Sequence, residues 1–131
     1  MSIVNVEHRS FELFIEENEI QASIKKVAGE INSRYQGKKP LFLGVLNGAF
    51  MFAADLLKYI EIDCQISFVK VASYSGTKST EHIKQLIGFD IPLEGRDVIV
   101  VEDIIDTGYT MEYILEQLNG MNVSSVAVAT L

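Results

Sequence analysis

Three carboxylates and a hydroxyl-rich turn form the part of this sequence best suited to chemistry. An apolar run ends in Glu102 and Asp103, and Asp106 and the turn Thr-Gly-Tyr-Thr (107–110) follow. A chain that enters a helix from such a turn offers free backbone N–H groups to an anion, and Gly108 lets the backbone come close to it. The turn is therefore expected to bind a phosphate group.

The acids need a different ligand, because carboxylates pointing at a phosphate would repel it. Carboxylates are good acceptors for a vicinal diol and good ligands for Mg²⁺, directly or through water. A ribose 5-phosphate presents both groups in one molecule, with its phosphate at the turn and its ring hydroxyls at Glu102 and Asp103. Asp106 would then lie near the anomeric carbon, where a carboxylate can take or share a proton.

Helix capping offers a simpler explanation of the same residues. Acids are common near helix N-termini because they interact well with the helix dipole, and threonine is a good N-cap residue. On this interpretation Glu102 and Asp103 are a solvated strand end, and Thr107 caps the next helix. Capping gives no reason for all three acids together, so the sugar-phosphate site is preferred.

Strand and helix patterns alternate around this segment. Apolar residues at helical spacing from Ile20 to Tyr35 predict an amphipathic helix, and the apolar run 40–46 predicts a strand buried on both faces. Further strands are predicted at 61–73, 83–90, 96–103 and 122–131, and further helices at 49–60 and 109–119. This alternation predicts an α/β fold with a mainly parallel sheet, in which ligands bind beyond the carboxyl ends of the strands.

The polar segment SYSGTKSTEH (73–82) separates two of the predicted strands and shows no periodicity. We expect a mobile loop there. Two interpretations stay open, an active-site lid and an ordinary hairpin connection. His82 within the segment is most simply a solvated side chain rather than a proton shuttle.

Three apolar side chains, Phe50, Met51 and Phe52, open the helix predicted at 49–60. Apolar residues on such a helix are usually core, so we expect two of the three to be buried. An exposed one would suit a subunit interface, and we expect a homo-oligomer.

Length, charge and cysteine content limit the class of protein. The chain has 131 residues, enough for one compact core, and its net charge of −7 comes without a cluster of Lys or Arg. That charge argues against nucleic acid and anionic membranes as partners and favours a small-molecule ligand. Cys64 is the single cysteine and is expected to be a reduced core thiol. No secretory signal or membrane-spanning run is recognisable, so the expected location is the cytoplasm.

The segment VIVVEDIIDTGYT (98–110) resembles the thirteen-residue ribosyl-phosphate motif of type I phosphoribosyltransferases. Its order Glu-Asp-x-x-Asp-Thr-Gly is similar to that of the hypoxanthine(-guanine) branch. The likeness extends to FLGVLNGAFMFAADL (42–56), which is similar to that branch's first strand and pyrophosphate loop. The pair Ser73-Tyr74 resembles the opening of its flexible lid, and the likeness begins at about Phe11.

This resemblance implies a type I phosphoribosyltransferase-like fold, with a mainly parallel sheet flanked by helices and a mobile lid hairpin. It implies transfer of the phosphoribosyl group from phosphoribosyl diphosphate to a 6-oxopurine, hypoxanthine first and guanine as a further candidate. The products would be IMP or GMP and pyrophosphate, the process purine salvage, and the required metal ion Mg²⁺.

The resemblance also implies residue roles. Glu102 and Asp103 would contact the ribose hydroxyls and the metal shell, and Asp106 would accept a proton near purine N7. The residues that would hold the 5-phosphate are Thr107, Gly108, Tyr109 and Thr110.

The loop after the first buried strand is implied to bind pyrophosphate through the backbone amides of Asn47 and Gly48. The Leu46–Asn47 bond is a candidate for a non-proline cis peptide, because the resembled loop contains one. Many relatives carry lysine in place of Asn47. The resemblance therefore implies pyrophosphate binding by the backbone at this position, without the charge that the lysine contributes.

The resembled family continues beyond Leu131 with a lysine that reads the purine oxo group, an aromatic residue that stacks on the base and an acid that helps hold the metal. We therefore expect residues 1–131 to form a single phosphoribosyltransferase-like domain that lacks this C-terminal part. A regulatory module that senses phosphoribosyl diphosphate or nucleotides without turnover is the alternative, because it would keep residues 102–110. A receiver-like signalling domain is disfavoured, because the Thr-Gly-Tyr-Thr turn would have no role there.

Overall fold

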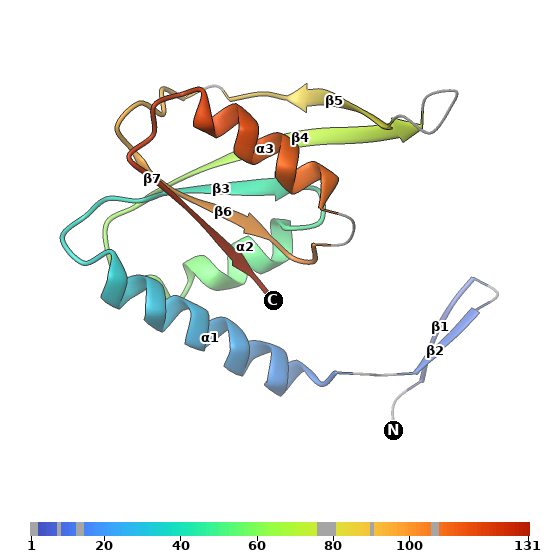
Figure 1. Cartoon of the computed structure of the whole chain (residues 1–131). Helices are drawn as coiled ribbons and strands as arrows, with labels where there is room; N and C mark the ends of the chain where they lie inside the picture. Colours follow the sequence, from blue (N-terminus) through green and yellow to red (C-terminus); the bar gives the residue numbers. More distant parts are fainter. Residues whose placement is uncertain (1–2, 8, 13–14, 76–80, 90, 106–107) are drawn as a thin grey trace.

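A five-stranded sheet forms the centre of the molecule (Figure 1). The structure is a computed structural model and describes residues 3–7, 9–12, 15–75, 81–89, 91–105 and 108–131. In sheet order the strands are β5 (Glu81–Ile87), β4 (Gln65–Ser75), β3 (Leu41–Leu46), β6 (Asp97–Glu102) and β7 (Ser125–Thr130). The pairs β4–β3, β3–β6 and β6–β7 are parallel, and only β5 runs antiparallel among these strands. The predicted α/β fold with a mainly parallel sheet is confirmed.

Helices cover both faces of the sheet (Figure 1). The helices are α1 (Glu17–Arg34), α2 (Phe50–Leu57) and α3 (Tyr109–Asn119). The first two pack on one face and α3 packs on the other, so each central strand is buried on both sides. Successive strand residues point to opposite faces. In β6 Ile99 therefore joins the core under α1 and α2, while Val98 and Val100 join the core under α3. This is why the central strands are continuous apolar runs.

The helix α1 forms where the apolar spacing predicts it. Ile24, Ala28 and Ile31 are its buried residues, at the i, i+4, i+7 spacing of one helix face. Its first turn carries acids and its last turn carries Arg34, an arrangement that suits the helix dipole. The helix predicted at 109–119 is also confirmed, with the same bounds.

An N-terminal hairpin is the element that the sequence patterns did not predict. Strands β1 (Ile3–Val6) and β2 (Arg9–Glu12) pair antiparallel, and Figure 1 shows them apart from the five-stranded sheet. Each has four residues, which is too short for an alternating pattern to stand out from chance.

The bounds predicted for the loop, 73–82, were wrong at both ends. The strand β4 continues to Ser75 and β5 begins at Glu81, so Ser73 pairs with Ile83 and Tyr74 pairs with His82. An outer antiparallel pair tolerates polar residues because its backbone groups bond across the hairpin, so hydropathy gives little signal there. Residues 76–80 lie outside the described residues. The β4–β5 pair reaches beyond the other strands of the five-stranded sheet in Figure 1, and whether it acts as a lid stays a prediction.

The start of α2 also differs from expectation. Phe52 is 4% exposed and belongs to the core, whereas Phe50 is 59% and Met51 67% exposed. Two core residues were expected among these three, and that prediction was wrong. The sheet-facing side of this short helix is already taken by Phe52, Ala53 and Leu56, so the helical turn directs Phe50 and Met51 to solvent.

Cys64 lies immediately before β4 rather than within it, and it is half-buried against the core under α1 and α2. Among the described residues, no helix combines the length and apolar character needed to cross a membrane.

Candidate functional site

The candidate site lies where two neighbouring parallel strands end. In the ladder between β3 and β6, Gly44 pairs with Val101, so the chain leaves both strands at the same edge of the sheet. The turn Asn47-Gly48 follows β3, and Asp103 follows β6. The tertiary structure thus brings together two segments that are more than fifty residues apart in sequence.

The two segments touch at Gly48. A Cβ added to Gly48 would lie 2.9 Å from Asp103 Oδ1 and 3.3 Å from Asp103 Oδ2. The backbone N–H of Ile104 donates a hydrogen bond to the same Oδ1 across 2.8 Å. The hydroxyl of Thr130, at the end of β7, donates to the backbone carbonyl of Asp103 across 3.3 Å.

The turn after β3 presents its backbone to solvent. Both Asn47 and Gly48 are exposed, and the Leu46–Asn47 peptide bond is cis, as predicted. Hydrogen bonds from Ala49 N–H to the Val45 carbonyl and from Phe50 N–H to the Asn47 carbonyl close the turn. The turn is therefore ordered by its own backbone and accessible to a ligand.

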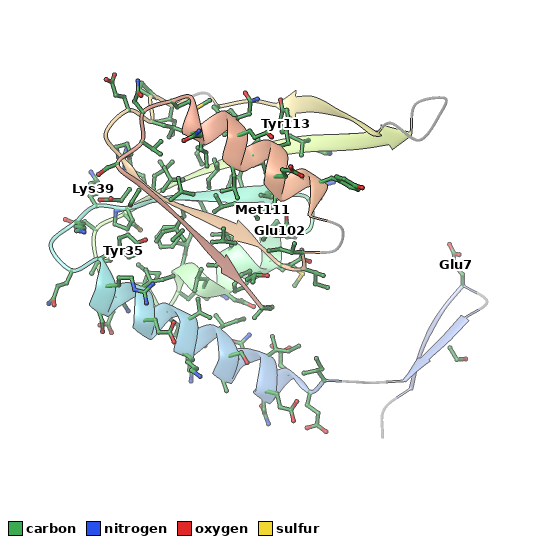
Figure 2. All side chains as sticks on the ribbon, viewed as in Figure 1. Glu7, Tyr35, Lys39, Glu102, Met111 and Tyr113 are labelled. Carbon is green, nitrogen blue, oxygen red and sulfur yellow. The ribbon has the colours of Figure 1, made fainter. Side chains whose placement is uncertain are left out.

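Glu102 has an unusual protonation equilibrium. Figure 2 shows this residue at the carboxyl end of β6, and its side chain is half-buried. Burial raises the pKa of Glu102 to about 7, and the hydrogen bond and negative charge of the adjacent Asp103 add to the effect. The charged form of Glu102 is therefore disfavoured in this structure, and a bound cation would stabilise it.

The helix α3 starts beside these acids. Its N-cap is Gly108, with a φ of 86°, and Glu112 N–H donates to the Gly108 carbonyl across 2.8 Å. A glycine suits this left-handed conformation because it has no Cβ to clash. The capping interpretation placed Thr107 at the N-cap, but Thr107 lies outside the described residues, and no side-chain cap bond is found among those that are described. The first turn of α3, including the exposed Tyr109 and the half-buried Thr110, can therefore receive an anion.

Two of the predicted site residues, Asp106 and Thr107, lie outside the described residues. Glu102 is the last residue of β6, and the others lie on the segments that follow β3 and β6, namely Asn47, Gly48, Asp103, Gly108, Tyr109 and Thr110. Ser73 and Tyr74 belong to β4, the other neighbour of β3.

Metal binding at this site would depend on few protein ligands. Among the described residues, no three His, Cys, Asp or Glu side chains gather as a metal cluster. The pair Glu102 and Asp103 remains, and two neighbouring carboxylates suit a hard divalent cation whose other ligands are water and substrate oxygens.

Sequence reasoning missed a groove of about 720 Å³ along α3. It begins near Ile105 and Gly108 and runs past Leu115 to Ser125 and Val126 at the start of β7. The feature of the sequence that could have indicated this groove is the uncharged sequence of the outer strand β7, SVAVAT.

Comparison with known proteins decides the family. The family model described as "Phosphoribosyl transferase domain" matches residues 15–131. The chain belongs to the phosphoribosyltransferase family. One similar relative, named hypoxanthine-guanine phosphoribosyltransferase, comes from Bacillus subtilis and is 38% identical over 127 residues, 96% of this chain and 71% of the relative. A relative of the same name from Streptococcus pyogenes is 41% identical over 116 residues, 88% of this chain and 64% of the relative.

Solved structures agree with the family assignment. A crystal structure of a hypoxanthine phosphoribosyltransferase from Staphylococcus aureus superposes with a TM-score of 0.86 at 33% identity, covering 92% of this chain and 66% of that one. This phosphoribosyltransferase chain therefore spans about two thirds of the length of the relatives it matches.

Proposed function

We propose that this phosphoribosyltransferase moves the phosphoribosyl group from phosphoribosyl diphosphate to a 6-oxopurine, hypoxanthine or guanine, in purine salvage. The observation that carries the proposal is the meeting of an exposed backbone turn, an acid pair and a helix N-terminus at one sheet edge. These three features match the pyrophosphate, the ribose diol and the 5-phosphate of one substrate. The names of the similar relatives support the same reaction.

Each feature would act on one part of the substrate. The first turn of α3 would hold the 5-phosphate through backbone N–H groups, and Asn47 and Gly48 would hold the pyrophosphate. Glu102 and Asp103 would accept hydrogen bonds from the ribose hydroxyls, and their negative charge would stabilise the positive charge that develops at the ribose C1. Asp106 would take the proton from purine N7 as the new bond forms.

Mg²⁺ is the cofactor that we propose, with Glu102 and Asp103 as the residues that hold it. When bound, it would neutralise charge on the departing pyrophosphate. The raised pKa of Glu102 supports this choice, because a cation beside this carboxyl group would favour its ionised form.

We also propose a homo-oligomer in the cytoplasm. The exposed Phe50 and Met51 support self-association, because adjacent large apolar side chains on a surface favour burial against a partner. Light scattering coupled to gel filtration would measure the mass, and Phe50→Ser with Met51→Ser is expected to shift it toward the monomer.

The reaction can be tested by supplying phosphoribosyl diphosphate and Mg²⁺ with hypoxanthine, guanine and xanthine in turn. Two proteins should be compared, this chain and a version extended with the C-terminal residues of the Bacillus subtilis relative. Formation of IMP or GMP by either protein, and its loss in Glu102→Gln, is the expected result. Tight binding of phosphoribosyl diphosphate without turnover in both proteins would instead favour the sensing module.

A further inference from the structure

The carboxylate of Asp103 occupies the space beside the turn after β3. A methyl group at position 48 would come within 2.9 Å of Asp103 Oδ1, closer than real Cβ atoms come to other atoms. The backbone of Gly48 does not require glycine, because the described glycines with positive φ are Gly37, Gly95 and Gly108. The neighbouring acid is thus the feature of the structure that excludes a side chain at position 48.

Asp103 has little freedom to move away from this turn. The oxygen nearest to Gly48, Oδ1, also accepts the hydrogen bond from Ile104 N–H at 2.8 Å. Swinging the whole carboxylate away from Gly48 about the Cα–Cβ bond would break that hydrogen bond, because the side chain is short. The backbone of Asp103 is held from the other side by Thr130 of β7. Asp103 is therefore a fixed contact surface for the turn.

We propose that Asp103 is a positioning residue, which fixes the Asn47-Gly48 turn relative to the acidic loop, the segment that begins at Asp103 after β6. This inference rests on the proposed function, because the turn's ligand is the pyrophosphate group of that substrate. In this role Asp103 acts through the backbone of Gly48, apart from any contact of its own with ribose or metal. The spacing between the pyrophosphate half and the ribose half of the site would then be set by one carboxylate packed against one glycine.

A double-mutant cycle tests the inference with inorganic pyrophosphate and Mg²⁺ as the probe, in isothermal titration calorimetry. Pyrophosphate has no ribose, so a lost contact between Asp103 and the ribose hydroxyls does not affect the result. A lost contact between Asp103 and Mg²⁺ affects both proteins of the Asp103→Ala background equally, so it cancels in the comparison. Gly48→Ala is expected to weaken binding by about tenfold or more, because the methyl group must displace the turn. In the Asp103→Ala background, the same Gly48→Ala change is expected to cost only about twofold or less.

Two further variants separate the packing of Asp103 against Gly48 from the charge of Asp103 and from the general effect of replacing glycine by alanine. Asp103→Asn keeps the shape and the acceptor oxygen, so Gly48→Ala should remain as costly in that background as in the wild type. Gly29→Ala is the matched control, because a Cβ there meets no described atom within 4 Å. Thermal unfolding of the four proteins of the cycle gives a readout without ligand, and Gly48→Ala should lower Tm less when Asp103 is alanine.

The outcomes distinguish this inference from the function on which it rests. An equal loss of pyrophosphate affinity and of Tm from Gly48→Ala in both backgrounds would overturn the positioning role alone. Failure of the wild type to bind either phosphoribosyl diphosphate or pyrophosphate would overturn the proposed function, and the positioning role for that ligand with it.

Discussion

The hydroxyl of Thr130 donates a hydrogen bond to the backbone carbonyl of Asp103 across 3.3 Å, so the end of β7 is tied to the acidic loop after β6. In the parallel ladder Thr130 pairs with Glu102, so the side chain of Thr130 lies beside Asp103, the residue that follows Glu102. The acid pair is thus supported from both neighbouring strands of β6, by Thr130 from β7 and by the Gly48 turn from β3.

Removing this tie should have a small, measurable cost. Thr130→Val keeps the side-chain shape and is expected to lower the free energy of unfolding by about 0.5–1.5 kcal/mol, the usual net value of one hydrogen bond. Urea unfolding would measure it, and Thr130→Ser should restore most of the loss. Equal stability of the valine and serine variants would show that the hydroxyl contributes nothing.

Gly108 should tolerate alanine poorly because of its conformation. Its φ of 86° is left-handed, and an L-residue there costs roughly 1–2 kcal/mol. Gly108→Ala is therefore expected to reduce stability by about that amount, as measured by urea unfolding. Gly29→Ala, inside α1 with room for a methyl group among the described atoms, should instead stabilise by about 0.5–1 kcal/mol.

The stability of the metal-free protein should fall as pH rises between 4.5 and about 7. The pKa of Glu102 is raised from 4.5 to about 7 by burial and by Asp103, so the folded state holds this proton more tightly than the unfolded state does. The resulting stabilisation is fully present below pH 4.5 and is lost as pH rises through the folded pKa. Melting curves at several pH values should show this dependence in the wild type and a flatter one in Glu102→Gln.

Added Mg²⁺ should oppose the fall in stability with rising pH if it binds Glu102 and Asp103. Ligand binding to the folded state raises Tm, and ionised carboxylates bind the cation better, so the gain in Tm should increase with pH. A gain of the same size in Glu102→Gln would place the metal elsewhere.

Asp106→Asn should separate chemistry from binding in an active protein. Loss of a general acid or base typically lowers kcat by about 10²-fold or more, while asparagine keeps the size of the side chain. The measurements are kcat at saturating substrates and the calorimetric affinity for phosphoribosyl diphosphate with Mg²⁺, which should change little. Unchanged turnover would contradict the role of Asp106 as proton acceptor.

Cys64 should react slowly with alkylating reagents. Burial raises the pKa of its thiol, and the charge of Asp63 adds to the effect, so little thiolate is present near neutral pH. Iodoacetamide labelling at pH 8 is expected to be slower than for the urea-unfolded chain. Asp63→Asn should speed labelling of the folded protein, while Glu112→Gln serves as the acidic control, because α3 packs on the opposite face of the sheet from the core that Cys64 joins.

Local sequence patterns predicted the elements that have strong periodicity. The helix α3 has its predicted bounds, and β3 and β6 lie within their predicted apolar runs, because burial on both faces requires continuous apolar residues. The β1–β2 hairpin and the extent of β4 and β5 were missed or misplaced. Their formation depends on backbone pairing between strands, which individual residue types signal weakly.

The sequence by itself determined the chemistry available at residues 102–110 and at Asn47-Gly48, because side-chain type and turn composition are local properties. Only the tertiary structure decided that Gly48 lies against Asp103, that Thr130 holds the acidic loop and that Glu102 has a pKa of about 7. Likewise, Phe50 and Met51 look like core residues in the sequence, and only helix packing directs them to solvent. Contact, burial and mutual repulsion depend on which strands are neighbours, and strand order is set by the packing of the whole sheet.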